Sequence, residues 1–308
     1  MDSKVEEVYV TVSIDTECDH DINWARSNPL TCHSINRGLP EILQPAFDQV
    51  GAVPTYLLTI EVLEDPEAVK TLRNLKGNFE YGTHLHAGFV EPQKKHHNYA
   101  AVDCADFQSS YPPEIEYQKL ATITDKFEKE IGYKPTSFRA GRFGASTDTI
   151  NSLQKLGYKV DTSVTPKIKW VEPNGVVDFR NAPGQPYFPG DSITSAGSSA
   201  KSRILEVPVT VKPRLFRRQP KWFRPWFASV DDMKAIYAHH LKKHADQKIV
   251  TINMMFHSME VIEKASPYPQ TTDEVKRFVD DMQQVLQWCG EEGAQFCGLS
   301  DLHATYQN

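Results

Sequence analysis

Short runs of apolar and β-branched residues alternate with amphipathic segments along nearly the whole chain. The apolar runs predict strands at residues 8–14, 54–59, 78–86, 136–139, 158–161, 204–210, 249–256 and 295–299. The amphipathic segments predict helices at residues 39–50, 66–75, 113–131, 147–156, 230–244 and 272–292. Strands that alternate with helices indicate βα units, a parallel sheet and right-handed crossovers.

The number of predicted strands favours a closed sheet over an open one. About eight such strands suit a barrel, and an open doubly wound sheet is the alternative. The open sheet is disfavoured because no glycine-rich phosphate loop follows the first predicted strand. A chain of 308 residues is long enough for one such unit, so we expect a single α/β domain over residues 1–308.

Three long polar segments interrupt the alternation, at residues 18–36, 87–112 and 162–203. Each follows a predicted strand, so all three should lie at the C-terminal face of the strands. Long loops in a compact domain usually form lids or binding walls. This face of an α/β barrel also carries its chemistry, so we expect the functional site there.

Two pairs of polar side chains end the first and third predicted strands. Asp15 and Glu17 follow an apolar run, and His84 and His86 follow another. Side chains two positions apart on a strand share a face. Two carboxylates that leave an apolar strand together are costly unless a cation neutralises them, and two such histidines suit a divalent cation. A solvated strand end and a chance His-x-His pair are the alternatives, but together the two pairs favour a metal site.

Later strand ends add further candidates. Arg139 and Arg142 end the fourth strand, Asp161 and Ser163 end the fifth, and His257 ends the seventh. An arginine here can hold a carboxylate bidentately, and a histidine that closes an apolar strand suits a general acid. We expect Arg142, Asp161 and Ser163 to contact substrate. The whole set matches a metal hydrolase, with ligands, a base, an acid and a cation that orients the base.

Three loop features have a functional and a structural explanation each. The cluster at residues 18–21 could supply a metal ligand, although such clusters are more often solvated. Tyr187 and the aromatic residues near Trp170 could stack on a sugar ring or pack in the core. The basic, aromatic segment 212–227 could touch a membrane surface, bind an acidic sugar, or be an ordinary loop; its prolines disfavour a regular helix.

Composition and charge exclude some classes of protein. The formal net charge of −6 and the pI of about 6.0 do not suit a general nucleic-acid binder. The sequence shows no secretory signal and no run of roughly 20 apolar residues. Its five cysteines are odd in number and form no Cys-x-x-Cys pair, which is typical of reduced thiols. We therefore expect a cytoplasmic protein, with peripheral membrane association through residues 212–227 as an option.

Five motifs in this order resemble those of the polysaccharide deacetylase family (the carbohydrate esterase family 4 superfamily). They are found at residues 13–17, 82–86, 138–144, 160–163 and 256–258. The tail at residues 266–268 and 296–300 is similar to the branch found among cell-surface polysaccharide gene products. The resemblance implies a distorted (β/α)7-type barrel and a hydrolase that removes an N- or O-acetyl group from a carbohydrate with a divalent metal, zinc being expected.

The resemblance also implies a role for each candidate residue. Asp15 would be the base, Arg139 would tether it, and His257 would protonate the leaving amine. Glu17, His84 and His86 would bind the metal. Other hypotheses are a related hydrolase of a small amide, a catalytically inactive glycan-binding barrel, and a glycosidase that uses Asp15 with Glu17.

Two departures from the family pattern concern the ligand set. The family's acidic pair is two adjacent aspartates, whereas one residue separates Asp15 from Glu17 here. The family's histidines are spaced by three residues, whereas one residue separates His84 from His86. His84 is therefore the firmer ligand. His96 or His97 could replace His86 as the third ligand, although a polar loop without ligands is favoured for that segment.

Overall fold

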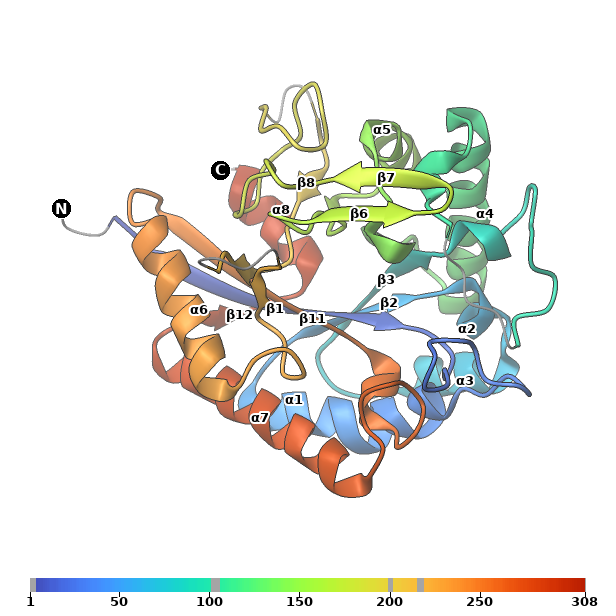
Figure 1. Cartoon of the computed structure of the whole chain (residues 1–308), viewed down its shortest axis with the longest axis horizontal. Helices are drawn as coiled ribbons and strands as arrows, with labels where there is room; N and C mark the ends of the chain where they lie inside the picture. Colours follow the sequence, from blue (N-terminus) through green and yellow to red (C-terminus); the bar gives the residue numbers. More distant parts are fainter. Residues whose placement is uncertain (1–3, 101–105, 199–201, 215–218, 308) are drawn as a thin grey trace.

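Seven parallel strands form the central sheet of the computed structural model (Figure 1). The structure describes residues 4–100, 106–198, 202–214 and 219–307. Their order across the sheet is β11 (Ile249–His257), β1 (Glu7–Thr16), β2 (Pro54–Leu58), β3 (Glu80–Leu85), β4 (Ser137–Ala140), β5 (Val160–Asp161) and β8 (Leu205–Glu206). A further short strand, β12 (Gln295–Phe296), also pairs with β1. Every neighbouring pair is parallel, as the alternation of predicted elements requires.

The two ends of this strand order meet through a short seam rather than a ladder. The backbone N–H of Thr210, just beyond β8, donates to the carbonyl of Asn253 on β11 over 3.1 Å. The N–H of Asn253 in turn donates to Thr210 Oγ1 over 2.8 Å. The curled sheet is thus joined into a distorted seven-stranded barrel, which confirms the predicted fold class.

Helices cover the outer face of the sheet (Figure 1). They are η1 (Ser34–Leu43), α1 (Gln44–Val50), α2 (Ile60–Glu64), α3 (Pro66–Asn74), α4 (Pro113–Ile131), α5 (Thr147–Leu156), α6 (Val230–Lys243), α7 (Thr272–Glu291) and α8 (Leu299–Gln307). The amphipathic helix predicted at residues 272–292 corresponds to α7, whose apolar face is buried, and Thr271 caps its first turn by accepting from Glu274 N–H. The sequence missed α2 and placed residue 299 in a strand, because short apolar runs suit either structure.

Alternation along β1 separates an apolar outer face from a polar interior. Val10, Val12 and Ile14 pack in the main apolar core. Ser13 points into the barrel, where its hydroxyl donates to Asn253 Oδ1 over 2.8 Å and accepts from Arg139. This interior network lies directly below the strand ends that carry the candidate residues.

Two short hairpins lie in the segments after β5 and β8. The first pairs β6 (Lys169–Glu172) with β7 (Gly175–Asp178), and the second pairs β9 (Val211–Lys212) with β10 (Lys221–Trp222). Figure 1 shows the β6–β7 hairpin beside the barrel strands rather than within their sheet. Both hairpins contribute to the pocket described below. Within the described ranges, none of the helices has the length and apolar character needed to cross a membrane.

Candidate metal centre and active site

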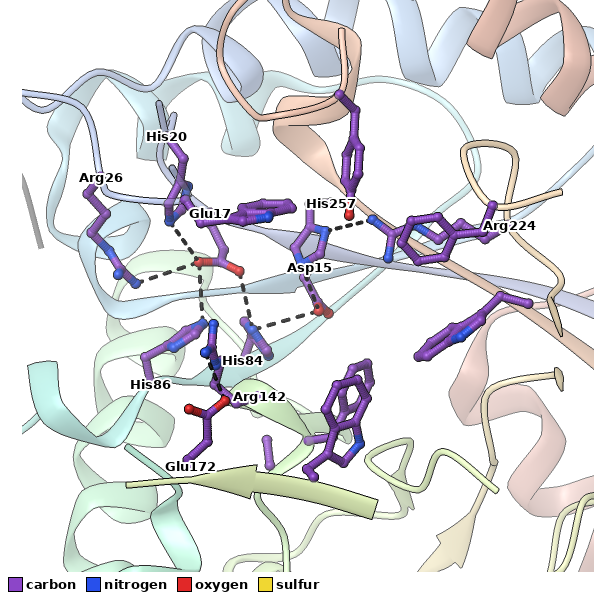
Figure 2. A pocket seen from close by; sticks show the side chains of 17 residues that line it. Asp15, Glu17, His20, Arg26, His84, His86, Arg142, Glu172, Arg224 and His257 are labelled. Atoms are coloured by element: carbon purple, nitrogen blue, oxygen red, sulfur yellow. Dashed lines mark hydrogen bonds and ion pairs between the residues drawn. The ribbon is translucent and has the colours of Figure 1, made fainter. Parts of the chain in front are cut away.

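A pocket of about 360 Å³ opens at the C-terminal ends of β1, β3, β4 and β11 (Figure 2). Its polar lining residues are Asp15, Glu17, His20, Arg26, His84, His86, Arg142, Glu172, Arg224 and His257. The first, third and seventh predicted strands therefore deliver their terminal side chains to one cavity. Arg139, from the fourth, lies immediately beneath it.

Glu17 is the centre of the cluster and is 3% exposed. Its Oε1 lies 3.4 Å from His84 Nε2, and its Oε2 lies 3.3 Å from His86 Nε2. Four donors about 2.1 Å from one tetrahedral ion lie roughly 3.4 Å apart, so these separations fit a zinc-like site. Among the described residues, two overlapping triads have donor atoms within 4.8 Å of one another: Glu17 with His84 and His86, and Asp15 with Glu17 and His257.

Backbone contacts fix the orientation of both histidines. His84 Nδ1 lies 3.0 Å from the carbonyl oxygen of Arg139, which can only accept, so Nδ1 carries a proton and Nε2 faces Glu17. The backbone at Gly141 passes close to His86, and a Cβ there would lie 2.9 Å from His86 Nδ1. Glycine is therefore required at this position for the second ring to lie beside Glu17.

Asp15 is held by an arginine from inside the barrel. Arg139 Nη1 donates to Asp15 Oδ1 over 2.6 Å, while Arg139 Nε donates to the carbonyl of Thr162 over 3.0 Å. The other oxygen, Oδ2, lies 3.8 Å from the Nε2 atoms of both His84 and His257. One carboxylate oxygen is thus tethered, and the other faces the pocket.

Burial and nearby positive charge act in opposite directions on the two carboxyls. Burial alone would raise the pKa of Asp15, but the charge of Arg139 and of the nearby histidines outweighs it and lowers the pKa. Burial likewise acts to raise the pKa of Glu17, but His86 and His84 hold it well below the usual range. Both groups are therefore carboxylates at neutral pH, ready to accept a proton or bind a cation.

His257 is oriented by Glu260, three residues further along. His257 Nδ1 donates to Glu260 Oε1 over 2.8 Å, which turns Nε2 toward Asp15. Arg224 forms an ion pair with the same buried carboxylate. Sequence reasoning missed Glu260, although its spacing from His257 is that of a capping box, which both residues form.

The buried charged groups around the pocket favour binding of a cation. Arg26 lies between two carboxylates, 3.6 Å from Glu17 Oε2 and 3.3 Å from Glu61 Oε1. The buried carboxylates of this network are Asp15, Glu17, Glu61 and Glu260, and its buried guanidinium groups are Arg26, Arg139 and Arg224. When the histidines beside these carboxylates are neutral, the buried cluster carries one negative charge more than positive, which a bound cation would neutralise.

His20 adds a third imidazole to the surroundings of Glu17. Burial lowers the pKa of His20 to about 4, so its ring is neutral at neutral pH. Its Nε2 lies 3.8 Å from Glu17 Oε2 (Figure 2). The sequence predicts a ligand from residues 18–21 only as an alternative to a solvated loop.

Aromatic side chains form the outer walls of the pocket. Phe143 and Trp170 stack with centroids 5.4 Å apart at 18°, and Trp222 packs on both. Arg142, held at a positive φ of 57°, forms a 2.8 Å ion pair with Glu172 of the β6–β7 hairpin. The pocket thus joins a charged floor to apolar faces of the kind that stack on rings.

Two residues expected to contact substrate lie outside this cavity. Asp161 and Ser163 are fully buried and are not among the residues that line the pocket. Ser163 Oγ donates to Asp161 Oδ1 over 2.6 Å and accepts from Ala140 N–H over 2.9 Å. Asp161 ends β5 beside Glu206 of β8. Its side chain is therefore buried between these two strands and does not reach the pocket at the strand ends.

Of the remaining residues that the sequence suggested for a functional role, some line the pocket and others lie elsewhere in the structure. Neither His96 nor His97 belongs to a donor cluster of the described chain, whereas His86 does. Tyr187 is buried and donates its hydroxyl to the carbonyl of Ile193. Segment 212–227 contributes Trp222, Arg224 and Phe227 to the pocket, while residues 215–218 lie outside the described residues. The four cysteines that the structure describes, Cys18, Cys32, Cys289 and Cys297, are free and buried.

Comparison with known proteins identifies the fold. No protein-family model and no curated protein sequence matches the chain. Among solved structures, the Puue allantoinase is 12% identical with a TM-score of 0.56, covering 99% of this chain and 93% of that one. A Mycobacterium smegmatis protein assigned to the polysaccharide deacetylases is 12% identical with a TM-score of 0.51, covering 96% and 89%. A GH57 branching enzyme from Thermococcus kodakaraensis is 10% identical with a TM-score of 0.50, covering 97% and 71%.

These similarities extend over nearly the whole chain at identities that establish the fold alone. The resemblance stated from the five motifs is confirmed at that level: the chain has the polysaccharide deacetylase fold, which the allantoinase also shares. One fold hosts several chemistries, so the reaction must be argued from the side chains in the pocket.

Proposed function

We propose that this protein is a metal-dependent deacetylase that hydrolyses an N- or O-acetyl group on an amino-sugar-containing glycan or its precursor. The observation that carries the proposal is the convergence of Glu17, His84 and His86 beside a tethered Asp15 and an oriented His257. A nitrogen- and carboxylate-rich donor set of this kind suits zinc.

Each residue of the pocket has a part in such a reaction. Glu17, His84 and His86 would hold the cation, which when bound acts as a Lewis acid toward the acyl carbonyl and favours ionisation of water. Asp15 accepts the proton of the attacking water on Oδ2, because Arg139 occupies Oδ1. Water adds to the carbonyl carbon, and the bond from that carbon to the leaving group breaks. His257, held through Nδ1, donates a proton from Nε2 to the leaving amine or alcohol.

The aromatic walls support a carbohydrate as the substrate. Phe143, Trp170 and Trp222 present apolar faces beside the charged floor, and sugar rings stack on such faces. The ion pair between Arg142 and Glu172 at the rim offers donors and acceptors for hydroxyl groups. The similarity of residues 266–268 and 296–300 to a branch found among cell-surface polysaccharide gene products extends the proposal to the synthesis or modification of a surface polysaccharide.

A glycosidase mechanism fits the pocket less well. A glycosidase needs one carboxyl of its pair to keep a proton near neutral pH and act as an acid. Asp15 and Glu17 both have lowered pKa values, since the surrounding positive charge outweighs the effect of their burial. The direction of both shifts therefore disfavours either carboxyl as the acid.

Hydrolysis of a small amide is the second candidate function. Of the three structures compared above, the allantoinase has the highest TM-score, 0.56, and the alignment with this chain covers 93% of its length. The same base, acid and donor cluster would serve a cyclic amide that fits a cavity of about 360 Å³.

The decisive experiment measures acetate release from a panel of N- and O-acetylated sugars, with allantoin included as a small amide. We expect turnover of at least one acetylated sugar by zinc-loaded protein and loss of turnover after chelation. Turnover of allantoin alone would transfer the proposal to the second candidate. Chelator-insensitive turnover, or none by folded zinc-loaded protein across the panel, would reject the deacetylase proposal.

A further inference from the structure

Lys119 of α4 is a charged side chain in the interior, with an exposed fraction of 0%. Its Nζ donates to the carbonyl oxygens of Ala87 and Val90 over 2.9 and 2.5 Å, and lies 3.4 Å from that of Gln93. The same nitrogen lies 4.5 Å from the centroid of the Tyr111 ring. A buried ammonium group is costly unless its three N–H donors are satisfied. The three carbonyls and the ring face meet this requirement.

All three carbonyls belong to the turn formed by residues 87–93, which begins directly after His86. The last residue of β3 is Leu85, and His84 pairs with β4 within that strand. His86 instead lies beyond the strand and is the N-cap residue of the short helix η2 (Ala87–Phe89). The backbone ladder of the sheet therefore fixes His84 directly, whereas the position of His86 depends on the turn that follows it.

The same turn supports a second side chain that faces Glu17. The guanidinium carbon of Arg26 lies 3.9 Å from the centroid of the Phe89 ring, and Phe89 is fully buried. Arg26 Nη2 lies 3.6 Å from Glu17 Oε2, the oxygen that His86 Nε2 approaches to 3.3 Å. Figure 2 shows both side chains directed at this oxygen. The 87–93 turn thus follows one neighbour of Oε2 and supports the other.

We propose that Lys119 is a positioning residue for the metal cluster, because its amine holds the 87–93 turn so that His86 and Arg26 face Glu17. The proposal rests on the proposed function, in which Glu17 and His86 bind a metal. Lys119 is not among the residues that line the pocket, so it acts through the turn and contacts neither substrate nor metal. A hydrocarbon side chain here would leave buried carbonyls without this donor, and the turn would shift toward other partners.

The first test is a double-mutant cycle on zinc affinity. Competition with a chromogenic chelator measures zinc binding by wild-type protein, Lys119→Met, His86→Ala and the double variant. We expect each single substitution to weaken zinc binding about 10- to 100-fold. The double variant should stay within about threefold of His86→Ala, because Lys119 acts through a side chain that is then absent. Lys129→Met, exposed on the same helix, is the matched control and should leave the affinity unchanged.

A lysine that only stabilises the fold predicts a different pattern. Lys119→Met would then lower the Tm of metal-free protein but keep wild-type zinc affinity, or the two losses of affinity would multiply in the double variant. Either result would overturn the proposal. Visible absorption of bound Co²⁺ gives a second readout, and the spectrum of Lys119→Met should resemble that of His86→Ala. Absence of zinc binding by wild-type protein would instead reject the metal-dependent function on which the proposal rests.

A further measurement uses wild-type protein and does not depend on whether a variant folds. The N–H groups of Phe89 and Val90 donate to the carbonyls of His86 and Ala87 over 3.1 and 3.3 Å. Their hydrogen exchange in metal-free protein reports whether the turn is already formed. If Lys119 holds the turn, both groups should exchange slowly before zinc is added. Fast exchange that slows only with zinc would mean that the metal shapes the turn, and would refute the role of Lys119.

Discussion

Asp15 and His84 flank the same space but should fail in different ways when replaced. Asp15 is tethered through one oxygen by Arg139, whereas His84 points its Nε2 at Glu17. We expect Asp15→Asn to keep the metal and lose turnover by at least about 100-fold, as loss of a general base does. His84→Ala should lose the metal itself. Measuring both the metal content, by mass spectrometry, and the turnover of each variant distinguishes the two roles. Loss of the metal from Asp15→Asn but not from His84→Ala would refute them.

Glu260 is the residue whose function the sequence did not suggest, and it acts through His257. Its carboxylate accepts from His257 Nδ1 and pairs with Arg224. Glu260→Gln retains an acceptor but removes the charge, so we expect kcat to fall roughly 10- to 100-fold with zinc affinity unchanged. Glu263→Gln is the control, because Glu263 lies three residues away and is exposed. An unaltered kcat would assign Glu260 to stability alone.

The β6–β7 hairpin offers an internal control for substrate binding. Trp170 faces the pocket, while the next residue, Val171, is 66% exposed on the opposite face of the strand. We expect Trp170→Ala to raise KM about 5- to 10-fold through loss of a stacking face, with a smaller effect on kcat. Val171→Ala should leave both constants unchanged. Equal effects of the two substitutions would mean that the hairpin acts only as a scaffold.

The pairing of β5 with β8 places two carboxyls side by side in the interior. Burial raises the pKa of Asp161, and burial together with the charge of Asp161 raises the pKa of Glu206 well above its usual range. The unfolded chain releases both protons near about pH 4, whereas the folded protein keeps a shared proton to higher pH. The free energy of unfolding should therefore fall as pH rises from about 4 toward the raised pKa of Glu206.

Glu206→Gln tests this sign. An amide is neutral at every pH and can still bond to Asp161, so the variant should be more stable than wild type at about pH 8 and similar to it at about pH 5. A gain of about 1 kcal/mol corresponds to roughly 2–4 °C in Tm. Urea unfolding at the two pH values measures the effect, with the exposed Glu128→Gln as control. A variant less stable than wild type at the higher pH would contradict the shared proton.

Metal binding should stabilise the whole barrel because it joins strands distant in sequence. Glu17 follows β1, and His84 and His86 come from the end of β3, which β2 separates from β1. An ion present at about 100 times its Kd adds about 2.7 kcal/mol to the free energy of unfolding. We expect zinc to raise the Tm of metal-free protein by several degrees, and chelator to reverse the shift. A full shift in His84→Ala would place the ion elsewhere.

The sequence by itself determined the strand ends and the faces that they share. The period of two along a strand puts Asp15 beside Glu17 and His84 beside His86, and alternating elements require parallel strands whose C-terminal ends meet. These are local rules, and each depends on a few neighbouring residues. The fold class and the pocket that gathers these four residues were therefore predictable.

Only the tertiary structure decided which other side chains complete the pocket. Glu260, His20 and the aromatic walls come from loops and hairpins, whose paths no hydrophobic period fixes. The same reason explains why Asp161 and Ser163 lie outside the pocket. Their positions at the end of a predicted strand do not indicate that β8 lies beside β5 and that both side chains are buried there. Periodicity specifies the face of one element, whereas through-space partners depend on how distant elements pack.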